Sequence, residues 1–307
     1  MTLQQLRYIV AIDQFRHFGK AAEALDLNQS TLSLMVKKLE DELDLLIFDR
    51  DSYPISPTEV GRKVIDQAKI VLYNVDQLRE MTKSEKQSTT GILKIAMIST
   101  VAPVLVPGLF KYLSKHHPGI SLITEEMPSN TIMEKLSKAE VDMGILAEPV
   151  SSPDLLTIPL FHEKFFAYAD KGQKKKGGTI TREALRKGKV WVMKDGLQLF
   201  DESMSEDDST FSYDRFYEGS RVGILVQMVN ENGGMTIIPQ THINLIRPGD
   251  TDNILEIVDS ELKRTIVIAI RRDYIHEGML NAVIHAVRAI IPEELLDDLV
   301  KAGDMAI

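Results

Sequence analysis

Short apolar runs and amphipathic segments alternate along most of the chain, and this alternation limits the fold more than any other feature. The runs have the length and the β-branched content of buried strands, and the segments between them repeat apolar residues with a helical period. The predicted strands are 92–98, 120–126, 141–147, 156–168, 190–193, 235–238 and 266–270, and the predicted helices are 103–116, 131–138, 181–186, 221–230 and 276–289. This order predicts an α/β domain over 91–307 with a largely parallel sheet. Such sheets bind ligands at the carboxyl ends of their strands, often in a crevice between two lobes.

The first 57 residues follow a different pattern, with three short helices and a small extended turn. An apolar stripe marks the first helix, the second is short and rich in alanine, and Asn28 is a good N-cap for the third. The third helix carries apolar side chains on one face, at Leu32, Met35, Val36, Leu39 and Leu43. A turn at 51–54 and an extended return at 55–57 then complete a predicted N-terminal domain over 1–57.

A long helix is predicted from Thr58 to about residue 86, because this stretch has no proline and Gly61 is its only glycine. Its apolar positions alternate at spacings of four and three residues, which is the pattern with which two helices wrap around each other. The predicted dimerisation residues are Val64, Ala68, Val71, Val75 and Leu78. A helix packed on its own domain would give the same pattern and is the alternative. The polar stretch 83–90 closes this linker helix and hinge, which together span 58–90.

Composition excludes several kinds of protein. With 44% hydrophobic and 26% charged residues in a chain of 307, we expect two folded domains and not a disordered chain. The absence of cysteine excludes zinc ribbons, iron–sulfur clusters, thiol nucleophiles and disulfide switches. The N-terminus lacks the basic region of a signal peptide, and no apolar window could span a membrane, so we expect a cytoplasmic protein without a membrane partner. A net charge of -9 argues against a general nucleic-acid coat but permits a local DNA-reading face.

The leading turn of the third predicted helix carries polar side chains on the face opposite its apolar stripe. A helix, a tight connection and such a second helix form the helix-turn-helix pattern, in which the second helix enters the major groove. Amide and hydroxyl groups there can pair with base edges, and nearby basic residues can contact phosphates. The predicted DNA-binding residues are Lys20, Gln29, Ser30, Thr31, Ser33, Lys37 and Arg50. A solvated polar helix face is the alternative.

The N-terminal segments resemble the LysR-type transcriptional regulators. The matching segments are 3–8 (LQQLRY), 18–25 (FGKAAEAL), 28–33 (NQSTLS), 38–43 (KLEDEL), 48–50 (FDR) and 58–61 (TEVG). The resemblance implies a winged helix-turn-helix, a long linker helix and a two-lobed α/β effector domain similar to periplasmic binding proteins. Lobe I would span about 91–162 and 268–307, and lobe II about 163–267. The resemblance also implies homodimers or homotetramers that bind an interrupted palindrome of double-stranded DNA and act on RNA polymerase.

Two residues of the N-terminal domain depart from the family pattern. Asp44 stands where the family usually has glycine, and Tyr53 stands where it often has a second basic residue. Residues 1–86 hold 12 Lys and Arg against 14 Asp and Glu. We therefore expect only modest non-specific affinity for DNA, with a steep dependence on salt.

Within the family, the effector domain looks most like the peroxide-sensing OxyR branch, through 98–103 (ISTVAP), 232–239 (NGGMTIIP) and 264–266 (RTI). The redox element of that branch is missing, because Leu197 stands where the branch has histidine and Gln198 where it has the reactive cysteine. A thiolate attacks peroxide, and an amide cannot. We therefore expect no peroxide sensing by disulfide formation.

The resemblance places four polar residues in the effector cleft: Thr100, Ser129, Gln198 and Arg264, with Thr131 a rival for the position of Ser129. Together they would suit a small oxygen-bearing ligand. Thr100 lies between a predicted strand and a predicted helix, where the helix dipole favours anions and polar groups. Capping or inter-strand hydrogen bonds are the alternative role of each residue.

No motif in the sequence indicates catalysis, a metal site or a cofactor, since GxGxxG, Walker A, GxSxG and HExxH patterns are absent. We therefore expect a LysR-type DNA-binding regulator, not an enzyme, that responds to an unknown small polar effector or to none. The alternative is a cytoplasmic small-molecule-binding protein with the same effector fold and no role at DNA.

Overall fold

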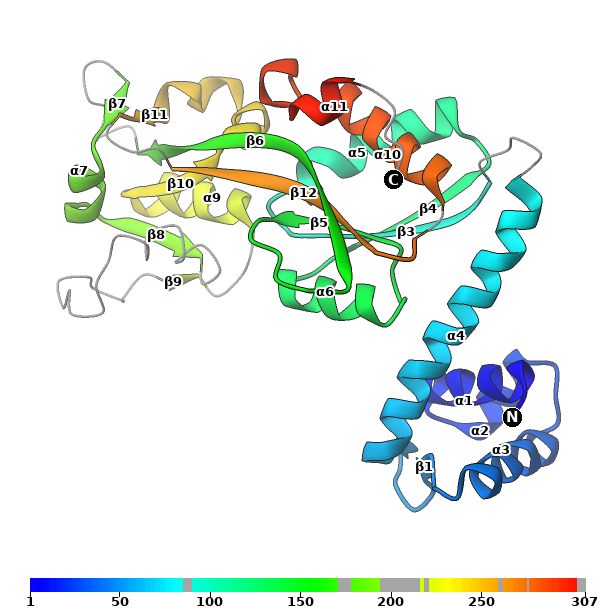
Figure 1. The fold of residues 1–307 in the computed structure, drawn as a ribbon. Coiled ribbons are helices and arrows are strands. Elements are labelled where there is room, and N and C mark those ends of the chain that lie inside the picture. Colours follow the sequence, from blue (N-terminus) through cyan, green and yellow to red (C-terminus); the bar gives the residue numbers. More distant parts are fainter. Residues whose placement is uncertain are drawn as a thin grey trace. The chain divides into compact units, whose positions relative to one another are not determined.

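A computed structural model describes residues 1–84, 90–170, 178–193, 216–217, 221–258, 262–274 and 276–302. The chain divides into two compact units, each with its own hydrophobic core (Figure 1). Unit 1 comprises Met1–Ser88 and Glu134–Asp142, and unit 2 comprises Thr89–Met133 and Met143–Ile307. Over the described ranges, no helix combines the length and the apolar character needed to cross a membrane.

The N-terminal part of unit 1 is a three-helix head with a two-stranded wing. It contains α1 (Leu3–Phe15), α2 (Phe18–Ala24), α3 (Gln29–Leu43) and the antiparallel pair β1 (Phe48–Asp49) and β2 (Ser56–Pro57). The three predicted helices and the extended return are therefore confirmed. Thr2 and His17 cap α1 and α2 with side-chain hydrogen bonds to backbone N–H groups, whereas Asn28 occupies the N-cap of α3 without such a bond.

The long helix α4 (Glu59–Ser84) packs against the head, so both share one core. Ile65 and Ala68 of α4 are buried in this core together with the apolar stripes of α1 and α3. The close approach of α4 to Ile47, the residue before β1, requires glycine at position 61. A Cβ atom on Gly61 would lie 1.9 Å from the carbonyl oxygen of Ile47, well inside van der Waals contact.

Unit 2 is built on a sheet that has ten strands in the described part of the chain, in the order β4-β3-β5-β12-β6-β10-β8-β9, with β11 on β6 and β7 on β11. Its strands are β3 (Gly91–Met97), β4 (Ile120–Glu126), β5 (Met143–Ala147), β6 (Leu155–Ala169), β7 (Thr179–Ile180), β8 (Val190–Met193), β9 (Phe216–Tyr217), β10 (Met235–Pro239), β11 (Ile254–Ile257) and β12 (Lys263–Arg271). Its helices are α5 (Ala102–His116), α7 (Arg182–Lys187), α9 (Val222–Asn232), α10 (Glu277–Ile290), α11 (Asp298–Ala302) and the 3₁₀ segments η3 (Gln240–Leu245), η4 (Pro248–Asn253) and η5 (Glu293–Leu295). The helix α6 (Ser129–Ser137) begins in unit 2 and ends in unit 1.

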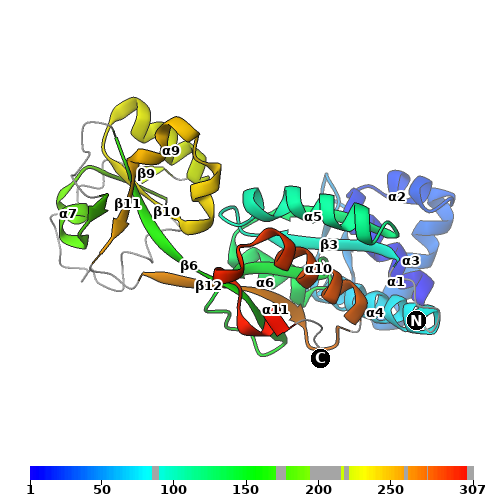
Figure 2. The same cartoon turned by 90° about the horizontal axis from the view of Figure 1, so that it is seen from above.

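The sheet is mixed, which corrects the expectation of a largely parallel one. β3 pairs parallel with β4 and β5, as helix-connected strands do, but β12 pairs antiparallel with both β5 and β6. The two long strands β6 and β12 run between the lobes (Figures 1 and 2). β6 pairs with β12 along 155–164 and with β10 along 165–169. β12 already pairs with β5 at Ile266, so the expected lobe boundary at 267/268 falls inside a strand.

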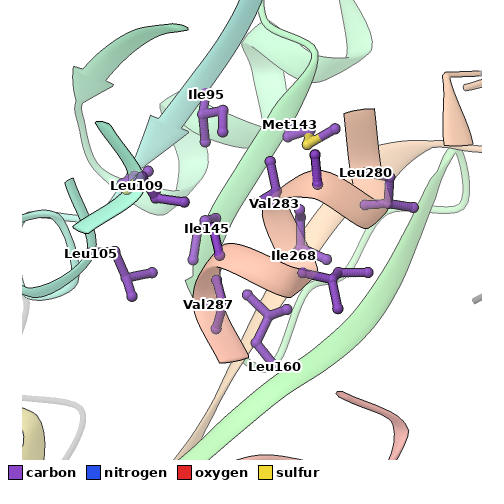
Figure 3. Packing of buried hydrophobic residues seen from close by; sticks show 14 of the residues in the cluster. Ile95, Leu105, Leu109, Met143, Ile145, Leu160, Ile268, Leu280, Val283 and Val287 are labelled. Carbon is purple, nitrogen blue, oxygen red and sulfur yellow. The ribbon is translucent and has the colours of Figure 1, made fainter. Parts of the chain in front are cut away.

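The core of lobe I lies where the paired helices α5 and α10 meet the strands. Buried side chains of both helices and of four strands interlock there, including Ile95, Leu105, Leu109, Met143, Ile145, Leu160, Ile268, Leu280, Val283 and Val287 (Figure 3). Each of them is at most 1% exposed. Lobe II has smaller clusters around β6, β10 and β11.

Gly61→Ala should destabilise the protein by about 1–3 kcal/mol, because the new methyl group overlaps a backbone carbonyl that cannot move without shifting the wing. Chemical denaturation followed by far-ultraviolet circular dichroism measures this loss. Gly223→Ala is the matched control, since Gly223 is also helical and a Cβ there meets no atom within 4 Å. Equal effects of the two substitutions would contradict the assigned role of Gly61.

Candidate nucleic-acid interface and ligand site

One side of α3, beginning at its first turn, is polar and faces solvent. Gln29, Ser33 and Lys37 follow one another at four-residue steps, so they share one side of the helix. Gln29 and Lys37 are exposed and Ser33 is half-buried, while Leu32 and Val36 are buried on the other side. The structure therefore places three of the predicted DNA-binding residues together on one stripe.

Ser30 and Thr31 complete the first turn of α3, where Ser30 is exposed and Thr31 is half-buried. Asn28 makes no side-chain bond to this turn. Helix N-termini carry unpaired N–H groups and a partial positive charge, which favour phosphate oxygens. This end of α3 therefore presents N–H groups from which a phosphate oxygen could accept hydrogen bonds.

The two predicted phosphate contacts differ in their surroundings. Lys20 lies exposed in the first turn of α2. Arg50 lies at the end of β1, where its Nη2 donates to Oε2 of Glu40 at 2.8 Å and its guanidinium lies 5.7 Å from the ring centre of Phe18. Arg50 therefore has a structural role in the wing, whatever it contributes at DNA.

Glu40 is a residue that sequence reasoning missed. It is 3% exposed, and its Oε1 accepts the backbone N–H groups of Ile47 and Phe48 at 2.8 and 3.2 Å. Together with the Arg50 pair, these bonds attach the wing to α3. The signal was available, because Glu40 follows Val36 by four residues and so falls on the buried stripe of the helix.

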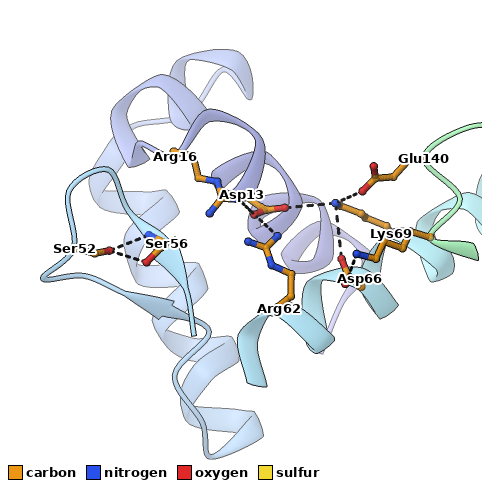
Figure 4. Close-up of polar contacts among 9 residues, drawn as sticks. Asp13, Arg16, Ser52, Ser56, Arg62, Asp66, Lys69 and Glu140 are labelled. Atoms are coloured by element: carbon orange, nitrogen blue, oxygen red, sulfur yellow. Dashed lines mark hydrogen bonds and ion pairs between the residues drawn. The ribbon is translucent and has the colours of Figure 1, made fainter. Parts of the chain in front are cut away.

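The wing and the end of α3 contain both departures from the family pattern. Ser52 and Ser56 bond to each other across the wing at 3.0 Å (Figure 4). The Ser52 hydroxyl also donates to the carbonyl of Asp49 at 2.9 Å. Tyr53, at the tip, is 93% exposed. Asp44 adopts φ 51°, the left-handed conformation that ends α3, and glycine takes this conformation at lower cost.

The predicted dimerisation residues fall into two groups along α4. Ala68 is 3% exposed in the core of the head, and Val64 and Val71 pack against that core. Further along the helix, Val75 is half-buried and Leu78 is 62% exposed. The first half of the stripe thus packs on its own domain, while Leu78 leaves apolar surface open.

In unit 2, two of the predicted effector residues meet where β6 and β12 cross between the lobes. Arg264 donates from Nη1 to the hydroxyl of Thr100 at 2.8 Å and from Nε to Oε1 of Glu163 at 2.8 Å. The Glu163 side chain is fully buried and that of Arg264 is 11% exposed. Phe165 lies beside the guanidinium, 5.4 Å from it to the ring centre. Both Thr100 and Arg264 are therefore already bonded within the protein.

Thr241 and His242 of η3 also bond to this group of residues, which comprises Thr100, Glu163 and Arg264. The other Glu163 oxygen accepts from the backbone N–H and the hydroxyl of Thr241 at 3.0 and 2.7 Å. His242 is 4% exposed and donates from Nε2 to the Thr100 carbonyl at 2.8 Å. Sequence reasoning missed Glu163 and His242. The alternation of inward-facing Phe161, Glu163 and Phe165 along β6 was the signal for Glu163.

The remaining predicted effector residues do not join this cluster in the described structure. Ser129 is half-buried at the first position of α6, and its rival Thr131 bonds to Asn130. Gln198 lies outside the described residues. The structure thus brings together Thr100 and Arg264 and leaves Ser129 apart from them.

A cavity of about 420 Å³ opens beside the first turns of α5. Its lining residues are Ala102, Pro103, Val106, Pro107, Thr124, Glu125, Glu126 and Arg221. The lining combines apolar α5 side chains with two glutamates at the carboxyl end of β4. Thr100, Ser129 and Arg264 do not line it. Among the described residues, no cluster of His, Asp and Glu could hold a metal ion.

Two family models match the sequence. The model described as "LysR substrate binding domain" matches residues 86–291, and "Bacterial regulatory helix-turn-helix protein, lysR family" matches residues 3–62. The DNA-binding transcriptional dual regulator OxyR of Escherichia coli K12 is 28% identical over 292 residues, which cover 94% of this chain and 95% of that protein. The hydrogen peroxide-inducible genes activator of Pectobacterium carotovorum is 29% identical over 274 residues, with coverage of 88% and 90%.

Solved structures agree with these matches. A full-length OxyR variant from Pseudomonas aeruginosa superimposes with a TM-score of 0.80 at 29% identity, covering 97% of this chain and 98% of that one. Full-length CbnR in complex with its target DNA has a TM-score of 0.63 at 18% identity, covering 95% and 100%. The second similarity concerns the fold alone.

His242, the buried histidine beside Thr100 and Glu163, predicts that the stability of the protein depends on pH. Burial holds the pKa of His242 below its ordinary value of about 6.5, although its bond to the Thr100 carbonyl and the charge of Glu163 partly raise it. The unfolded chain therefore binds the proton first as the pH falls below about 6.5. The free energy of unfolding should decrease from there until the pH reaches the folded-state pKa.

His242→Gln keeps an N–H donor for the Thr100 carbonyl but does not titrate. We expect urea denaturation to show a smaller loss of stability between about pH 7.5 and about pH 5.5 for this variant than for the unmodified chain. The same loss in both proteins would show that His242 does not carry this pH dependence.

Proposed function

Because this chain belongs to the LysR family of bacterial regulatory helix-turn-helix proteins, we propose that it regulates transcription by reading operator DNA with α3 and the wing. The family consists of DNA-binding transcriptional regulators, and the relatives named above include OxyR. The residue-level roles that follow are part of this proposal.

The polar stripe of Gln29, Ser33 and Lys37 on α3 is the observation that carries the proposal. An amide at the first position can pair with adenine N6 and N7, and a hydroxyl one turn later can pair with either base edge. Lys37 continues the stripe, and Lys20 lies exposed on α2 for a phosphate. Ser30 and Thr31 sit at the helix N-terminus, where a phosphate oxygen would lie. Arg50 and its partner Glu40 hold the wing beside this face.

We propose that α4 joins two chains into a homodimer, and that two dimers form a homotetramer. The open apolar side chain of Leu78 and its neighbour Val75 support a contact beyond the head, whereas Ala68 is already used within the chain. Two heads related by a twofold axis would bind an interrupted palindrome, whose half-site spacing follows the geometry of the dimer.

The effector domain would respond to a small polar ligand or act without one. Thr100, Arg264, Ser129 and Gln198 remain the proposed ligand residues, with Thr100 and Arg264 supported as neighbours by their 2.8 Å bond. A ligand can change DNA binding only if it has different affinities for two arrangements of the protein.

We propose that this chain does not sense peroxide by disulfide formation, although several relatives are named hydrogen peroxide-inducible genes activators. The sequence contains no cysteine, and the disulfide needs two thiols. The proposed partners are instead operator DNA and RNA polymerase, with a cytoplasmic location that follows from them. The alternative of a binding protein without a role at DNA is less favoured, since residues 3–62 match the family's helix-turn-helix model.

Gln29→Ala should relax sequence preference at one base pair of each half-site, with a loss of about 1–3 kcal/mol of discrimination, because it removes a base-edge contact. Lys20→Ala should instead weaken binding to all sequences and lower the slope of log affinity against log salt by about one. Gel-shift titrations with matched and mismatched duplexes at several salt concentrations measure both effects.

Lys38→Ala is the matched control, because Lys38 is an exposed lysine of α3 that lies off the polar stripe. It should retain the sequence preference of the unmodified chain. Arg50→Ala is a poor test of phosphate contact, since it leaves the buried Glu40 carboxylate without its cation. If Gln29→Ala and Lys20→Ala both bind as the unmodified chain does, the assignment of α3 to the groove is wrong.

A further inference from the structure

A buried carboxylate lies where α1 meets α4. Asp13 is 7% exposed, and three cations surround it: Arg16 of the same helix and Arg62 and Lys69 of α4 (Figure 4). Its Oδ1 lies 2.9 Å from both arginines, and its Oδ2 lies 3.5 Å from Nζ of Lys69. We call these four residues the Asp13 cluster.

The cluster restrains α4 at two points. Arg62 and Lys69 are seven residues apart, which places them on the same side of α4 about 10 Å from each other. Between them, Ile65 and Ala68 pack into the core of the head. Apolar packing has little directionality, whereas charge-assisted hydrogen bonds are short and directional. The ion pairs therefore restrain the tilt of α4, which apolar contacts alone would restrain less.

The two α4 partners are unequal. Arg62 donates to Asp13 at 2.9 Å, within hydrogen-bond distance. Lys69 lies nearer to Glu140 of unit 1, to which it donates at 2.7 Å, than to Asp13. Asp13 therefore shares Lys69 with two other carboxylates, Glu140 and Asp66, and Arg62 provides the main bond from Asp13 to α4.

We propose that Asp13 is the positioning residue that sets the direction in which α4 leaves the head, and through it the preferred spacing of the two DNA half-sites. This inference rests on the proposed function, in which α4 joins two chains. With 26 residues, α4 is about 39 Å long. A tilt of about 10° at its base moves its far end by about 7 Å, which is about two base-pair steps along a strand.

The test replaces the charge and keeps the shape, with Asp13→Asn in the full-length chain. The half-site is the sequence that the unmodified chain selects from a pool of randomised duplexes. Each DNA probe carries two copies of it, and the separation between the copies changes by one base pair from probe to probe. We expect single half-site affinity to stay within about twofold of the unmodified chain. The preference for the best separation over separations two base pairs away should fall by about tenfold. Arg62→Gln should reproduce this loss, and Lys69→Gln should cause a smaller one.

Asp41→Asn is the matched control, because it removes the same charge at an exposed position of α3. It should leave the spacing preference intact. A purely structural role of Asp13 predicts a different result, in which half-site affinity and all separations weaken in parallel with thermal stability. That result, or an unchanged spacing preference in Asp13→Asn, would overturn the inference while leaving the proposed function standing.

A measurement without DNA separates the two proposals. The chain has no cysteine, so Glu23→Cys on α2 and Asn74→Cys on α4 can be spin-labelled without background. Dipolar spectroscopy, with excess unlabelled chain present, should show a broader or shifted label distance when Asp13→Asn is added. An unchanged distance distribution would overturn the inference. Recovery of no sequence from the duplex pool would instead overturn the proposed function, and the distance measurement would still decide whether Asp13 directs α4.

Discussion

Three contacts between secondary-structure elements of the described chain contain a buried carboxylate bonded to arginine, and we call these contacts joints. Asp13 joins α1 to α4, Glu40 joins α3 to the wing, and Glu163 joins β6 to β12 and η3. A carboxylate is tolerated in a protein interior only when cations and hydrogen-bond donors satisfy its oxygens. The observed arrangement of elements at each joint satisfies the carboxylate, and an arrangement that separates it from its partners would leave a buried charge unpaired.

Apolar packing and these ion pairs contribute in different ways. The cores around α1, α3 and α4 and around α5 and α10 supply most of the favourable free energy, but apolar contacts have little directionality. Removal of one partner of a fully buried pair costs about 3–5 kcal/mol. The cost is smaller for the Asp13 and Glu40 pairs, because Arg62 and Arg50 are 38% and 40% exposed and solvent screens their charges. Each pair consequently restrains the angle between the elements that it joins: α1 and α4, α3 and the wing, and β6 and its neighbours β12 and η3.

The helices, the polar stripe of α3 and the family could be predicted from the sequence because they depend on local period and on the spacing of nearby residues. The ion pairs of Asp13, Glu40 and Glu163 with their arginines could not be predicted from the sequence. Arg62 lies 49 residues from Asp13, and Arg264 lies 101 residues from Glu163, so only the folded chain brings them together. The antiparallel β6–β12 pairing was missed for the same reason. Ala68 shows the remaining ambiguity, since one helical stripe serves equally for an internal core and for a partner chain.

The Glu163–Arg264 pair has a consequence for molecular selectivity. Both carboxylate oxygens and two of the guanidinium nitrogens are already bonded within the protein. An approaching anion would have to compete with Glu163, and an approaching cation with Arg264. For the ligand site proposed at this junction, selectivity would therefore come from fit and from uncharged dipoles and not from attraction between net charges. Affinity governed in that way would vary little with ionic strength, in contrast to the proposed contacts of the head with phosphates.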